Sequence, residues 1–188
     1  MGEKKMKMIP KDDRKLALVI VDVQKKFILG KDDDTLRIAA DCIPTMQKTI
    51  EMFRDAGRPV IWILYEGPTH MEGMTDDTYE LLDGFEIKDG DFVLKKYHMN
   101  AFNNTSLSDL IRSNDCDAAL IMGMFAQYCV MSTYWGAFDK DVSPYMMKGG
   151  LISNRDDICE HVYAVCKTYD MEELKSNLKI HRKIKDSS

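Results

Sequence analysis

The stretch "AALIMGMFAQYCVMSTYWGAF", residues 118–138, joins an apolar run to a segment of helical character. A short, continuous apolar run is typical of a strand buried on both faces, as in parallel sheets covered by helices. Cys129 falls near the join between the expected strand (118–123) and the expected helix (128–140). The stretch therefore raises two questions: which fold contains it, and whether Cys129 is a buried thiol or a nucleophile.

The rest of the chain repeats this alternation of strand and helix. Further strands are expected at 16–22, 59–65, 92–96 and 143–149. Helices are expected from Pro44 to Gly57 and over 106–115, 155–169 and 170–180. Strands that alternate with helices predict a parallel sheet with helices on both faces, an α/β fold.

The chain is expected to form one domain over residues 1–188. Residues 1–15 are polar and are expected to be flexible. Residues 66–91 form a long connection with few core signals, which suggests a lid or a contact with a neighbouring subunit.

Composition excludes several classes of protein. A net charge of −5 argues against a nucleic-acid partner, which would need a clustered basic surface. No apolar run approaches the length of a membrane span, and the N-terminus lacks the apolar core of a signal peptide. The five cysteines include no CxxC pair, so reduced thiols in a cytoplasmic protein are expected. No GxGxxG motif supports a dinucleotide cofactor.

Reactive side chains stand at the ends of three expected strands. Asp22 ends the first strand, Lys95 and Lys96 end the third, and Cys129 follows the fourth. Ligands of open parallel sheets bind beyond the carboxyl ends of the strands, so these groups are expected at one edge. Each also has a structural reading: Asp22 as a cap, Lys96 as a surface lysine, and Cys129 as a small core side chain.

An acid, an amine and a thiol make a coherent catalytic set. A helix N-terminus and a nearby ammonium both favour the thiolate, the nucleophilic form of cysteine. A carboxylate can accept the thiol proton and later donate it to a leaving amine. Backbone N–H groups in the turn before Cys129 could bind an oxyanion.

The chain resembles the isochorismatase-like cysteine hydrolases, the superfamily of nicotinamidases, N-carbamoylsarcosine amidohydrolases and ureidoacrylate hydrolases. Three segments within residues 16–150 carry the resemblance: "LALVIVDVQKKF", "LKKYHMNAFNNTSLSDLI" and "LIMGMFAQYCVMSTYWGAF". Alignment on Ala101 and Phe102 makes Lys96, rather than Lys95, the family lysine. The positions that match the family pattern are Asp22, Gln24, Phe27, Lys96, Gly123, Cys129, Val130, Thr133 and Ala137.

The resemblance implies a three-layer α/β/α fold with a mostly parallel sheet of about six strands. It implies that Cys129 attacks a carbonyl carbon, that Asp22 accepts and then donates a proton, and that Lys96 holds the anionic pair. It also implies a cis peptide bond at Met124–Phe125, oxyanion-hole amides at Phe125 and Cys129, a small-molecule substrate and a homo-oligomer. Aromatic residues that flank the triad in sequence are candidates for a substrate pocket: Phe27, Tyr97, Phe125 and Tyr128. Tyr65 could line the pocket or pack in the core, and Trp62 is expected in the core.

Several positions depart from the family pattern and leave the substrate open. Ala126 and Gln127 replace a common Thr-Asp, and Asn100 replaces a Ser. Lys25–Lys26 replaces Asn-Asp, and the usual Asp after the fifth strand is missing near Gly149–Gly150.

The nicotinamidase branch binds a metal through Asp-x-His after the second strand. The corresponding "YEGPTH" offers only Glu66 and His70 as ligands and does not reproduce that motif. We therefore expect no metal and no cofactor, and we disfavour nicotinamide as the substrate.

The main prediction is hydrolysis of a small amide-type C–N bond through a thioester at Cys129. One alternative is vinyl-ether hydrolysis of the isochorismatase type, which does not depend on a cysteine. A second is a catalytically silent binding protein that keeps the fold, and the weakest is a redox-sensing thiol.

Overall fold

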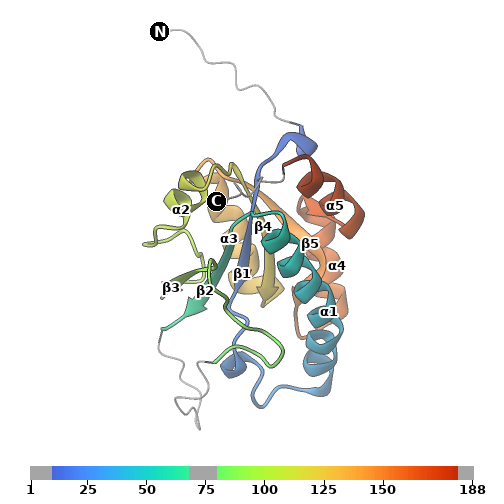
Figure 1. The fold of residues 1–188 in the computed structure, drawn as a ribbon. Coiled ribbons are helices and arrows are strands. Elements are labelled where there is room, and N and C mark those ends of the chain that lie inside the picture. The colour runs from blue at the N-terminus through green and yellow to red at the C-terminus, as the bar shows by residue number, and fades with distance from the viewer. Residues whose placement is uncertain (1–9, 68–79, 182–188) are drawn as a thin grey trace.

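A computed structural model describes residues 10–67 and 80–181 and shows a six-stranded, all-parallel sheet (Figure 1). The strand order is β3-β2-β1-β4-β5-β6. The strands are β1 (Leu16–Val21), β2 (Val60–Tyr65), β3 (Phe92–Lys96), β4 (Ala118–Met124), β5 (Ser143–Ile152) and β6 (Thr168–Tyr169). The helices are α1 (Asp33–Asp55), α2 (Leu107–Ser113), α3 (Met131–Phe138), α4 (Asp156–Val165) and α5 (Met171–Ile180).

Two hydrophobic cores lie on the two faces of the sheet. Successive residues of β1 point to opposite faces, so Leu18 belongs to one core and Val19 to the other. Helices α1 and α5, side by side in Figure 1, cover the first core. Helices α2, α3 and α4 contribute to the second. The expected three-layer α/β/α architecture is confirmed.

Helix α1 begins much earlier than the sequence suggested. We expected Pro44 in the first turn, but the helix starts at Asp33 and contains Pro44 in its interior. Asp32 caps it, accepting the Thr35 amide at 2.8 Å. Ile38 and Ala39, before the proline, lie in the core. The cap and this buried face outweigh the backbone hydrogen bond lost at the proline.

The C-terminal half of the sheet also differs from expectation. Strand β5 continues past 149 to Ile152, through a shift in its register with β4 near Gly149–Gly150. The helix expected over 155–169 ends at Val165 as α4, and Thr168–Tyr169 pairs with β5 as β6. Both errors arise because short or interrupted strands give little periodic signal.

Residues 10–15 contact the body of the protein, and the flexibility expected for residues 1–15 stays a prediction. A short 3₁₀ turn spans Lys11–Asp13, and the Tyr169 hydroxyl donates to the Lys11 carbonyl at 2.6 Å. Arg14 pairs with Asp117 at 2.8 Å. Residues 1–9 lie outside the described part of the chain.

The described end of the 66–91 connection packs on the body of the protein. Leu82 is buried in the core covered by α1, and Leu81 forms an antiparallel bridge with Gln24. The Trp62 indole, in the core as expected, donates to Asp91 at 2.9 Å. Residues 68–79, to which the lid prediction mainly applies, lie outside the described residues. Among the described helices, none combines the length and apolarity needed to cross a membrane.

Candidate active site

Asp22, Lys96 and Cys129 all lie at the carboxyl ends of strands. Asp22 directly follows β1 and has a positive φ of 54°. Lys96 is the last residue of β3. Cys129 lies in a single turn of π-helix, Ala126–Val130, between β4 and α3. Because β1, β2, β3 and β4 are neighbours in the sheet, the fold brings these three positions to one edge.

Asp22 and Lys96 form a buried ion pair. The Lys96 Nζ lies 2.7 Å from the Asp22 Oδ2, and both side chains are excluded from solvent. Strand β2 separates their strands, so the lysine must span about 10 Å of sheet to reach the carboxylate. It passes the ring of Tyr65, 5.0 Å from the centroid, and also donates to the His98 carbonyl at 3.0 Å. A long side chain is therefore required at position 96.

Gln24 has a structural role that the sequence interpretation did not assign. Its side-chain Oε1 accepts the Tyr65 amide at 2.8 Å, and its Nε2 donates to the Tyr65 carbonyl at 3.4 Å. The side chain thus continues the hydrogen bonding of β1 with β2 where the main chain of β1 turns away. The sequence did hint at this role, because a glutamine two residues after Asp22 is part of the family pattern.

The turn before Cys129 has the geometry that the resemblance implied. The Met124–Phe125 peptide bond is cis. The Phe125 carbonyl accepts the amides of Tyr128 at 2.9 Å and Val130 at 3.4 Å. Just upstream, Gly123 has a φ of 126°, and a Cβ there would lie 2.1 Å from the Val21 carbonyl oxygen. Only glycine allows β4 to approach β1 this closely before the turn.

The unusual residues of this turn have partners. The Gln127 Oε1 accepts the Ser153 hydroxyl at 2.9 Å, and its Nε2 donates to Asn154 at 2.9 Å. Ala126 is fully buried in the second core. The turn is therefore fixed to the segment that follows β5, despite its departure from the family pattern.

The loop after Lys96 is fixed to the helix after Cys129. The Ala101 amide donates to the Thr133 hydroxyl at 3.0 Å. Asn100, another departure, accepts the Phe102 amide at 2.8 Å and stabilises the same loop. The lysine and cysteine segments thus hold each other in place.

The surroundings of Cys129 favour its protonated form. Burial, followed by the Asp22 charge, raises the pKa of Cys129 to about 12, against the opposing effect of Lys96. Burial also raises the pKa of Asp22, opposed by the Lys96 ammonium, the Cys129 thiol and the Lys26 ammonium. Cys129 is therefore a thiol at neutral pH, and it needs a base to become a nucleophile.

The aromatic candidates divide into two groups. Phe27 contacts both Tyr65 and Phe125, with ring centroids 5.9 and 6.5 Å apart. Tyr97 and Tyr128 are 61% and 54% exposed, and the Tyr97 hydroxyl donates to Glu66 at 3.3 Å. Phe27, Tyr65 and Phe125 thus form an aromatic group at the end of β1 and β2, next to Asp22.

No cluster of three or more metal-binding side chains is present within residues 10–67 and 80–181. Glu66, one of the two candidate ligands, pairs with Lys95 and accepts from Tyr97. His70 lies outside the described residues.

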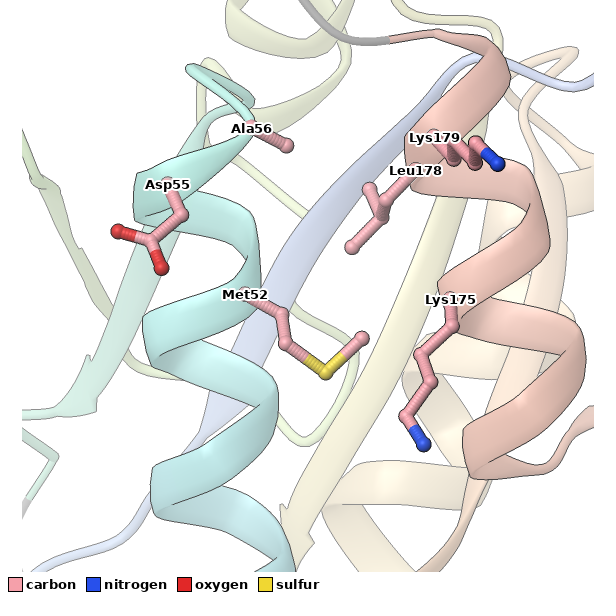
Figure 2. A pocket seen from close by; sticks show the side chains of 6 residues that line it. All are labelled: Met52, Asp55, Ala56, Lys175, Leu178 and Lys179. Atoms are coloured by element: carbon pink, nitrogen blue, oxygen red, sulfur yellow. The ribbon is translucent and has the colours of Figure 1, made fainter.

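A hollow of about 530 Å³ lies away from the triad, between the C-terminal parts of α1 and α5 (Figure 2). In a parallel sheet, the helix after β1 runs back toward the amino ends of the strands. The hollow is therefore at the opposite edge of the sheet from Asp22. Its lining residues are Met52, Asp55, Ala56, Lys175, Leu178 and Lys179.

Known proteins share this fold and part of this sequence. A secreted isochorismatase effector of Verticillium dahliae is 28% identical over 121 residues, which cover 62% of each chain. The chain thus spans less than two thirds of that relative. An isochorismatase family protein from Desulfovibrio vulgaris superposes with a TM-score of 0.76 at 20% identity, covering 88% of this chain and 99% of the other. For N-carbamoylsarcosine amidase from Thermoplasma acidophilum the TM-score is 0.69 at 24% identity, covering 83% and 95%.

The family model of the isochorismatase domain matches residues 16–165. This range includes all six residues or segments that build the site: Asp22, Gln24, Tyr65, Lys96, the turn before Cys129, and Cys129 itself. The chain belongs to the isochorismatase family.

Proposed function

We propose that the protein is a cysteine hydrolase that cleaves a small amide-type C–N bond through a thioester at Cys129. The observation that carries this proposal is the buried Asp22–Lys96 pair beside a thiol that is protonated at rest. Such a thiol can act only if a neighbouring group takes its proton as it attacks. Asp22 is placed to be that group.

The proposed reaction has two halves. The Cys129 Sγ attacks the substrate carbonyl carbon while its proton passes to Asp22, and the amides of Phe125 and Cys129 stabilise the oxyanion. The C–N bond then breaks, and the amine leaves with the proton from Asp22. Water attacks the thioester, Asp22 takes a proton from it, and the thiol is regenerated as the carboxylic acid leaves.

Lys96 keeps the Asp22 carboxylate in place and favours its ionised form before each proton transfer. In a site shielded from water, an ammonium 2.7 Å away is the strongest available counter-charge. Phe27, Tyr65 and Phe125 offer an apolar wall for a small substrate next to this pair. The Phe125 carbonyl accepts the amides of Tyr128 and Val130, the two residues on either side of Cys129.

The test is a screen of small amides and ureides with the wild type and Cys129→Ala. Mass spectrometry of rapidly quenched reactions should show an acyl group on the Cys129 peptide. Cys129→Ala should lose turnover and the adduct, whereas Cys166→Ala, which changes another half-buried thiol, should retain both. Turnover of an amide or ureide at the wild-type rate in Cys129→Ala would refute the thioester.

A further inference from the structure

A second lysine is buried close to the candidate active site. Lys26 lies in the 3₁₀ turn Lys25–Phe27, four residues after Asp22, and its exposed fraction is 0%. Its Nζ donates to the Tyr65 carbonyl. The same Nζ lies 4.9 Å from the centroid of the Tyr65 ring and 5.3 Å from that of Phe27. Lysine is almost never fully buried unless it is paired, and here its ammonium donates to a backbone carbonyl and lies near two aromatic rings.

Tyr65 brings the two buried ammonium groups together. Its ring has the Lys96 Nζ at 5.0 Å and the Lys26 Nζ at 4.9 Å from its centroid. Both ammonium groups act on the Asp22 carboxylate: Lys96 directly, at 2.7 Å, and Lys26 through its positive charge. Glu66 also acts on Lys26, and it is itself paired with Lys95.

The charges near Asp22 indicate how Lys26 affects the ionisation of the Asp22–Cys129 pair. Asp22 and Cys129 share protons as a coupled pair, which becomes reactive after losing its first proton. Lys96 balances the single negative charge of that state, and Lys26 supplies a second positive charge that favours it further. Burial and the Lys96 ammonium lower the pKa of Lys26, whereas Asp22 and Glu66 oppose that effect and support the ammonium form.

We propose that Lys26 is a positioning residue whose buried ammonium keeps the Asp22–Cys129 pair singly ionised under mildly acidic conditions. This role rests on the proposed function, because it prepares Asp22 and Cys129 for the attack. Lys26 is fully enclosed and bound to the Tyr65 carbonyl, so its placement suits an effect on Asp22 rather than a direct contact with substrate.

The experiment compares Lys26→Met and Lys26→Gln with Lys26→Arg and a matched control, Lys25→Met. Lys25 is adjacent in sequence but forms surface pairs with Glu80 and Asp83, so its removal changes the same net charge outside the site. The readout is the rate at which iodoacetamide alkylates Cys129, followed by peptide mapping across about pH 4–9. This rate does not require a known substrate.

We expect the acid limb of the alkylation profile to move to higher pH in both neutral variants. On that limb, labelling should be roughly tenfold slower than in the wild type, the order expected from losing one nearby charge in a partly shielded site. Lys26→Arg should restore the profile, and Lys25→Met should leave it unchanged. Thermal melting shows which variants fold. If Lys26→Met does not fold, Lys26→Gln provides the test, because its side chain can still donate to the Tyr65 carbonyl.

An unchanged acid limb in a folded neutral variant overturns the proposal, and so does an equal shift in Lys25→Met. Failure of the proposed function is detected separately, by undiminished turnover in Cys129→Ala. A protein without detectable hydrolysis still yields an alkylation profile, so the two ideas are judged on different data.

Discussion

Replacing Lys96 by methionine leaves Asp22 buried without its nearest positive charge. The side chains keep a similar length, but the 2.7 Å contact and the hydrogen bond to the His98 carbonyl disappear. Removing one partner of a buried ion pair typically costs about 3–5 kcal/mol in the free energy of unfolding. Asp22 can avoid being a buried, unpaired charge by binding a proton. Protonating an ordinary carboxyl at pH 7 costs about 4 kcal/mol, which sets an upper limit on the penalty from the unpaired charge.

The penalty should depend on pH. Burial already raises the pKa of Asp22 in the wild type, so its contribution to stability is present in acid and is lost as pH rises through the folded-state pKa. Without Lys96 that pKa rises further, and the loss continues to higher pH. The difference between variant and wild type should therefore grow with pH, by up to about 1.4 kcal/mol per pH unit.

Urea unfolding at about pH 5 and pH 8 measures this difference, with the midpoints compared at constant m-value. Lys95→Met is the control, because Lys95 is exposed on the same strand and pairs with Glu66 at the surface. It should change stability little at either pH. Equal stability of Lys96→Met and wild type at pH 8, or a penalty independent of pH, would refute the reasoning.

Two further substitutions test the supports of the site. Gly123→Ala should unfold the protein or lower its free energy of unfolding by several kcal/mol, because the new Cβ would lie 2.1 Å from the Val21 carbonyl oxygen. The control is Gly30→Ala, which is also at a positive φ but in open space, and it should lower stability much less in the same thermal melts. Gln24→Leu should lower the free energy of unfolding in urea by about 1–3 kcal/mol, because the Tyr65 amide loses its acceptor. It should also lower turnover by displacing Tyr65. Wild-type turnover in this variant would contradict that role.

Much of the fold could be predicted because the central strands are continuous apolar runs. Strands β1 to β4 were expected within a residue or two of their observed bounds, and the alternation with helices gave the fold class. The start of α1 could not be found from periodicity alone, since Pro44 is a stronger local signal than the cap at Asp32. Strand β6, with two residues, exists only through its pairing with β5.

The three expected side chains do converge at one edge, but their protonation could not be predicted from sequence. The thiolate expected for Cys129 depended on nearby positive charge, whereas burial and the Asp22 carboxylate prove stronger. Lys26 was noticed only as a departure from the family pattern, because nothing local distinguishes a buried lysine from an exposed one. The predictions of a homo-oligomer and of a cytoplasmic location stay predictions.

The position of β3 at the rim of the sheet has a consequence for amide exchange. Among the described strands, β3 pairs only with β2, and it ends in Lys96, so one part of the site depends on the least protected strand of that half of the sheet. Local opening of β3 would withdraw the counter-ion from Asp22 while β1 and β4 stay closed. Amide protons of β3 should therefore exchange faster than those of β1, and any ligand that binds across the site should slow them selectively.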